Sequence, residues 1–176
     1  MHRSLLSRIR ERKGLPKKWQ GKFGMKGLRN SMKDEIYFRV DGEIVGKGRP
    51  RVTTRGGFAR AYTPKRTIDC ENRIKSAYLE EYPLGLHWQN KEPLQMVVNI
   101  YRDIPKSTPK KLRNEMLLGY VRPVVKPDAD NLLKTIADAL NGVCYSDDSQ
   151  IVEITLNKWY AEEPKAEITI REIGKE

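Results

Sequence analysis

The residues best suited to chemistry lie in one stretch, KPDADNLLKTIADALNGVCYSDDSQ, in the last third of the chain. It holds Asp128 and Asp130, a second acidic pair at Asp147 and Asp148, and one lysine, Lys134. Carboxylate oxygens are the ligands that Mg²⁺ prefers, and bound Mg²⁺ can activate water and stabilise the charge that develops in phosphodiester cleavage. A nearby lysine can neutralise that charge or transfer a proton. The stretch therefore predicts a metal-dependent reaction at a phosphodiester.

A helix expected over 131–141 must position these groups. Asp130, Lys134 and Asp138 lie four residues apart, so they share one helix face. The apolar residues form the opposite, buried stripe: Leu132, Leu133, Ile136, Ala137 and Leu140. Asp130 is expected at the N-cap, and Gly142 ends the helix.

The loop after this helix is long enough to return to the helix start, so Asp147 or Asp148 can stand beside Asp128 and Asp130. Each residue alone also has a structural interpretation. Asp130 can serve only as a cap, Lys134 only as an ion-pair partner, and the Asp147–Asp148 pair only as part of a turn. We nevertheless favour the metal-site interpretation, because carboxylates repel one another and a fold gains nothing from gathering them without a function.

The charge of the chain favours a polyanionic partner. Its 34 Lys and Arg residues against 23 Asp and Glu give a net charge of +11. Residues 1–35 hold 11 basic and 3 acidic residues, so most of the excess lies there. We expect this segment to be a basic extension, flexible or conditionally ordered. A solubilising tail and a short docked helix are equally consistent with it.

A second basic segment, KGRPRVTTRGGFARAYTPKRT, holds seven basic residues and no acidic one. Its glycines and prolines predict a loop, and Phe58 and Tyr62 offer stacking surfaces among the charges. We favour a nucleic-acid contact over a merely solvated loop, because like charges without counter-ions repel. The candidate DNA-binding residues are Lys47, Arg49, Arg51, Arg55, Arg60 and Lys65.

The remaining patterns predict a single α+β (α/β) domain with a mixed sheet. Asp41-Gly42 marks a first hairpin and Glu162-Glu163-Pro164 a second, each flanked by alternating apolar residues. The other expected elements are helices over 67–81 and 107–118 and strands over 94–102, 121–126, 151–161 and 165–173.

Composition excludes several classes of protein. The length of 176 residues suits one ordinary domain. No stretch approaches the ~18 consecutive apolar residues of a membrane span. The first residues lack the apolar core of a secretory signal, and Cys70 and Cys144 lack metal-site spacing. We expect a cytoplasmic protein with no membrane partner.

The acidic stretch and its continuation through KAEITI resemble the C-terminal signature of RusA-type Holliday-junction resolvases, and the second basic segment is similar to that family's basic N-terminal segment. The resemblance covers about Tyr37 to Ile173. It implies an endonuclease domain over 36–176, a small α/β fold and a homodimer. The implied activity is Mg²⁺-dependent cleavage of four-way DNA junctions in recombination and repair.

By the same resemblance, Asp128, Asp130 and Asp148 match the metal-binding positions and Lys134 matches the active-site lysine. All four are therefore candidate catalytic residues, and Asp147 stays outside the set. Short members of that family lack the basic extension over 1–35. Ala129, between the two aspartates, is a mild variation that leaves the set of metal ligands unchanged. Two alternatives remain open: a metal-dependent nuclease for other branched or single-stranded DNA, and a non-catalytic nucleic-acid-binding protein whose acidic cluster structures a loop.

Overall fold

The computed structural model of the chain describes residues 35–49, 51–53 and 60–174. The strands are β1 (Glu35–Asp41), β2 (Arg51–Thr53), β3 (Arg60–Tyr62), β4 (Leu94–Asp103), β5 (Ile151–Ala161) and β6 (Lys165–Glu172). The helices are α3 (Lys65–Glu81), α4 (Lys110–Leu117), α5 (Ala129–Leu140) and a short 3₁₀ helix, η2 (Asp148–Gln150). The predicted extension over 1–35 lies, except for Glu35, outside the described residues.

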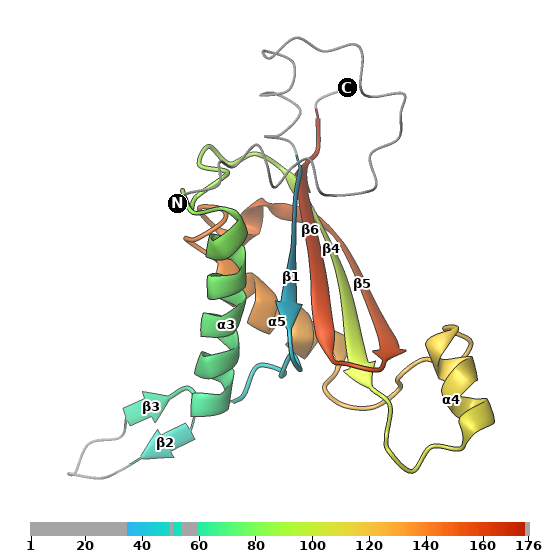
Figure 1. The fold of residues 1–176 in the computed structure, drawn as a ribbon. Coiled ribbons are helices and arrows are strands. Elements are labelled where there is room, and N and C mark those ends of the chain that lie inside the picture. Colours follow the sequence, from blue (N-terminus) through green and yellow to red (C-terminus); the bar gives the residue numbers. More distant parts are fainter. Residues whose placement is uncertain (1–34, 50, 54–59, 175–176) are drawn as a thin grey trace, which may run out of the picture. The chain divides into compact units, whose positions relative to one another are not determined.

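A mixed four-stranded sheet, in the order β1-β6-β4-β5, forms the body of the domain (Figure 1). Helices α3 and α5 pack against each other and against one face of this sheet. The two short strands β2 and β3 pair with each other in a separate antiparallel ribbon. The prediction of one compact α+β domain with a mixed sheet is confirmed.

Alternating apolar residues explain why the sheet buries one face. Side chains along a strand point alternately to opposite faces, and every second residue of β4 is buried, from Leu94 to Ile100. Strands β1 and β6 alternate in the same way. The buried face of α5 completes this core with Leu132, Thr135, Ile136, Ala139 and Leu140. The predicted stripe is confirmed at Leu132, Ile136 and Leu140, whereas Leu133 and Ala137 are only half-buried.

The first predicted hairpin is wrong. Strand β1 pairs antiparallel with β6, and the chain leaves the sheet at Gly42, which has φ +86°. Residues 43–49 instead run beside the helices: the Lys47 amide donates to the Asn131 carbonyl over 3.0 Å. A side chain on Gly46 would place its Cβ 2.8 Å from Pro127, so this close approach requires glycine.

The second predicted hairpin is also wrong, although both of its strands are present. Strand β4 lies between β5 and β6, pairing parallel with β5 and antiparallel with β6. The alternation of apolar residues identified β5 and β6 as strands, but it did not identify the strands with which they pair. The apolar β4 takes the centre, whereas β5, whose residues Val152 to Thr155 are exposed, takes an edge.

Three smaller predictions need correction. The segment 121–126 has no regular structure: side chains of the sheet bind the carbonyls of Val125 and Lys126, and Val124 is exposed. The predicted loop over the second basic segment contains β2 and β3 and ends in α3, which begins at Lys65. Helix α4 begins at Lys110 rather than at Ser107.

No helix in the described part of the chain is long and apolar enough to cross a membrane.

We expect Leu140→Ala to lower the free energy of unfolding by about 2–5 kcal/mol, because Leu140 is fully buried where α5 meets the core. The matched control, Leu84→Ala, removes the same atoms from a side chain that is 101% exposed and should change stability by less than about 0.5 kcal/mol. Urea denaturation followed by circular dichroism measures both. Equal losses would show that α5 is not anchored by its apolar face.

Candidate active site

The polar face of α5 carries Asp130, Lys134 and Asp138, one turn apart, because the opposite face is buried in the core. Together with Asp148 these side chains line a shallow depression of about 290 Å³. Its apolar wall consists of Leu133, Ala137, Ile151 and Ile154. The structure therefore brings three of the four predicted catalytic residues, Asp130, Lys134 and Asp148, to one depression.

Asp128, the fourth predicted residue, is the N-cap of α5. Asp130 was expected there, but it lies in the first turn instead. The Asp128 side chain makes no capping hydrogen bond, so its carboxylate stays available. Both carboxylates stand at the N-terminal end of α5. Asp128 lines a second, larger cleft beside the depression rather than the depression itself.

The neighbouring residues Asp147 and Asp148 have different surroundings. The Asp147 carboxylate accepts a hydrogen bond from the Ser149 amide over 2.9 Å and forms a capping box with Gln150. These hydrogen bonds from Ser149 hold the pKa of Asp147 below its ordinary value. Asp147 thus shapes the η2 turn, which presents Asp148, an exposed side chain, to the depression. This geometry favours the expectation that only Asp148 belongs to the catalytic set.

The expected return of the loop to the start of α5 is seen in part: Asp148 shares the depression with Asp130, but it does not line the cleft that Asp128 lines. The η2 turn is anchored at the beginning of β4, where Ser146 Oγ donates to the Gln89 carbonyl over 3.1 Å and Gln150 donates to Glu92. The residue before Asp128 is anchored at the end of β4 through Arg102 and the 126–127 segment. Ten residues of extended strand span roughly 30 Å. The η2 turn is therefore held near the beginning of β4, and the backbone before Asp128 is held near its end.

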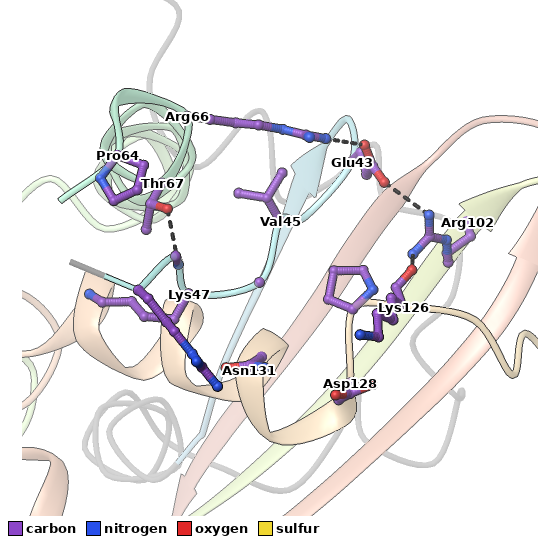
Figure 2. Close-up of a pocket in the computed structure, with 14 residues that line it drawn as sticks. Glu43, Val45, Lys47, Pro64, Arg66, Thr67, Arg102, Lys126, Asp128 and Asn131 are labelled. Carbon is purple, nitrogen blue, oxygen red and sulfur yellow. Dashed lines mark hydrogen bonds and ion pairs between the residues drawn. The ribbon is translucent and has the colours of Figure 1, made fainter. Parts of the chain in front are cut away.

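The cleft beside Asp128 is strongly charged and has a volume of about 850 Å³. Figure 2 shows Glu43 between two arginines, with Nη2 of Arg66 and Nη2 of Arg102 each 3.0 Å from a Glu43 oxygen. Arg102 also donates from Nη1 to the Lys126 carbonyl over 2.6 Å. Arg49 and the exposed Lys126 line the same cleft. The cleft combines one exposed carboxylate, Asp128, with several cations, a composition that suits a phosphate backbone.

Lys47 connects helices α3 and α5. Its Nζ lies 2.6 Å from Glu71 of α3 and 2.5 Å from Asp138 of α5. Burial by itself would lower the pKa of Lys47, but the hydrogen bonds and charges of Asp138 and Glu71 outweigh it and raise the pKa above 10.5. Asp138 is therefore paired with Lys47. Lys134 makes no ion pair within the described residues.

The other predicted DNA-binding residues are only partly described. Arg49 and Lys65 are exposed, with Lys65 at the first position of α3. Arg51 and Arg60 lie in the β2 and β3 ribbon, and their side chains fall outside the described part of the chain. Arg55 lies outside the described residues altogether. Their assignment to DNA binding stays a prediction.

Comparison with known proteins identifies the family. The family model "Endodeoxyribonuclease RusA" matches residues 41–171, which cover most of the chain and include every candidate residue of the two pockets. The chain belongs to the RusA endodeoxyribonuclease family. It is also 38% identical over 149 residues to "Uncharacterized protein YqaN" of Bacillus subtilis (strain 168), a match that spans 80% of this chain and 99% of that protein.

RusA-family nucleases depend on a divalent metal, and the donor chemistry of this chain fits one. Asp128, Asp130 and Asp148 are exposed carboxylates, and none of them is in an ion pair with a described residue. Among the residues that the structure describes, no group of three or more His, Cys, Asp and Glu side chains is placed to hold a metal ion. Mg²⁺ keeps several waters and takes only one or two carboxylates directly, with substrate phosphate completing its shell.

Sequence reasoning missed three residues that line the cleft of this RusA-family chain, Glu43, Arg102 and Lys126, and it missed Lys158, which binds the backbone before Asp128. The Lys158 ammonium donates to the carbonyls of Val125 and Pro127. Burial and the charge of Arg102 lower the pKa of Lys158, and the Asp128 carboxylate opposes that shift. A signal was present, since Arg102 and Lys158 each continue a row of alternating apolar residues at the end of a strand.

We expect Lys47→Met to lower the free energy of unfolding by about 2 kcal/mol at pH 7, because two carboxylates lose a charged hydrogen-bond partner. Because the pKa of Lys47 is raised in the folded protein, this stabilisation is fully present below pH 10.5 and is lost as the pH rises through the raised value. Urea denaturation at several pH values measures it.

The control is Lys65→Met, which removes an exposed lysine from the start of α3 and should change stability by less than about 0.5 kcal/mol. If Lys47 were only a phosphate contact, Lys47→Met would keep its stability. It would then flatten the slope of log affinity for DNA against log salt by about 0.9.

Proposed function

We propose that this chain is a Mg²⁺-dependent endonuclease that resolves four-way (Holliday) DNA junctions by paired phosphodiester cleavage, in DNA recombination and repair in the cytoplasm. The observation that supports it most is the group Asp130, Lys134 and Asp148 in one exposed depression of a RusA-family chain. Asp128 extends this group into a cationic cleft. A site that is exposed and open suits a polymer substrate better than a small molecule.

Bound Mg²⁺ would supply Lewis-acid stabilisation of the charge on the phosphate and would generate a hydroxide nucleophile. Asp128, Asp130 and Asp148 would hold it through their carboxylate oxygens. Lys134 stands between Asp130 and Asp138 on the helix face, and its ammonium is not neutralised by an ion pair with any described residue. It can therefore place a positive charge beside a phosphate oxygen or donate a proton to the leaving oxygen.

The separation of Asp148 from Asp128 supports the homodimer. A two-fold axis that sets two β5 edges antiparallel brings Asp148 of one protomer toward Asp128 of the other. Strand β5 is a sheet edge, and its Val152 and Ile154 are 60% and 50% exposed beside the depression. Exposed apolar side chains on an edge strand are suited to a protein partner. The two resulting sites would match the approximate two-fold symmetry of a four-way junction.

The cleft would hold the DNA backbone on the Asp128 side of the cut. Arg49 and Lys126 are exposed there, and Arg51, Arg55, Arg60 and Lys65 add positive charge in the preceding segment. Phosphate contacts fix the position of the DNA without reading its sequence. The basic residues of the 1–35 extension would add affinity in the same way, and all of these contacts weaken with salt.

We expect the purified protein to cut a synthetic four-way junction in Mg²⁺ and to leave it intact in EDTA. Asp148→Asn should abolish cleavage while junction binding is kept or strengthened, because a metal ligand and a charge that repels phosphate are both removed. The matched control is Asp147→Asn, which alters only the η2 cap and should retain most activity. Single-turnover assays and gel-shift binding measure the two properties.

Three outcomes would contradict the proposal. Equal cleavage of flaps or single strands would replace junction resolution with a broader nuclease activity. Binding without cleavage under any metal condition would indicate a non-catalytic DNA-binding protein. Loss of activity in Asp147→Asn but not in Asp148→Asn would exchange the roles of the pair.

A further inference from the structure

The three main-chain carbonyls that precede Asp128 are held by side chains of the sheet. Lys158 Nζ donates to the Val125 carbonyl over 2.6 Å and to the Pro127 carbonyl over 3.1 Å. Arg102 Nη1 donates to the Lys126 carbonyl between them over 2.6 Å. Two cations thus hold three successive carbonyls.

These bonds substitute for regular secondary structure. The segment 121–127 belongs to no helix or strand, so its carbonyls have no ladder partners, and carbonyls near the protein interior need donors. A lysine ammonium has three donors and an arginine five, so one side chain can serve two carbonyls. Side chains 124–126 are exposed, so burial does not fix this part of the segment.

Strands β4 and β5 place Arg102 and Lys158 near each other. Strands β4 and β5 are parallel, and Lys158 pairs in register with Ile100, two residues before Arg102. Because side chains two residues apart share a face, Lys158 and Arg102 both lie on the helix-facing side of the sheet, at the ends of its apolar rows. They meet the chain where it enters α5.

Arg102 also connects this segment to the cleft. Its second nitrogen binds Glu43, which binds Arg66 at the start of α3 (Figure 2). Arg102 is only 18% exposed, whereas Arg66 is 75% exposed. Both arginines line the cleft, and Arg102, the less exposed of the two, also holds the backbone before Asp128.

We propose that Lys158 and Arg102 are positioning residues that set the place of the Asp128 carboxylate at the start of α5. The role rests on the proposed function, in which Asp128 holds the metal. Each acts through the backbone of residues 125–127. Loss of either cation lets this segment move and weakens the metal site, as loss of outer contacts to a metal ligand costs about 10–100-fold in affinity.

Lys158→Met tests the proposal, because methionine keeps an unbranched chain but cannot donate to the carbonyls. Hydrogen exchange followed by mass spectrometry should show faster exchange in peptides spanning 121–132 and unchanged exchange in β1 and β6. Calorimetric titration with Mn²⁺ alone should show affinity at least about tenfold weaker than in the wild type. Lys158→Arg, which restores donors, should recover most of this loss.

The matched control is Lys165→Met on β6, a strand lysine whose Nζ binds Glu167 and lies over the Tyr101 ring. It should leave exchange over 121–132 and Mn²⁺ affinity unchanged. Suppose that the wild-type protein binds Mn²⁺ and cuts junctions. If Lys158→Met then shows unchanged hydrogen exchange over 121–132 and unchanged Mn²⁺ affinity, the positioning role is overturned. Wild-type protein that cuts no junction would instead overturn the proposed function. Faster exchange in Lys158→Met would then still show that the cations hold the segment.

Discussion

The packing of α5 against the sheet is the constraint on which the rest of the site depends. Burial of Leu132, Ile136 and Leu140 leaves one orientation of the helix, and that orientation turns Asp130 and Lys134 toward the depression. The same contact places the helix start, with Asp128, at the carboxyl ends of β4 and β5. Lys47 reinforces the packing by joining α5 to α3 through two carboxylates. A hydrophobic face therefore decides where the acidic residues stand.

The length of β4 sets the second condition. The η2 turn is held near its beginning and the segment before Asp128 at its end, so one chain separates two of the carboxylates that we propose as metal ligands. The two-fold dimer that we propose would reconcile this separation with a shared metal site. It also explains why the edge strand β5 keeps apolar side chains exposed beside the depression. On this account, activity and assembly are coupled, because within one protomer Asp148 shares the depression of Asp130 and Lys134 but not the cleft of Asp128.

Much of the fold could be predicted from the sequence, whereas strand partners and the positions of long-range contacts could not. The 3.6-residue spacing from Leu132 to Leu140 and the alternation of β4 identified both elements. Alternation says nothing about pairing, so the insertion of β4 between β5 and β6 was missed. Alternation marked Arg102 and Lys158 as charged residues in apolar rows, but their partners are backbone carbonyls, which residue type does not reveal. The resemblance supplied the family, and the roles of the site residues remain predictions.

Complementation between two inactive variants tests the shared metal site most directly. Asp128→Asn and Asp148→Asn proteins are each expected to be inactive alone. When they are mixed and allowed to exchange protomers, a mixed dimer carries one site with both aspartates intact and one with neither. Junction nicking should then return, in roughly a quarter of all sites if protomers exchange freely. If the mixture forms mixed dimers, shown by native mass spectrometry, yet remains inactive, both aspartates act within one protomer and the account of the site is wrong.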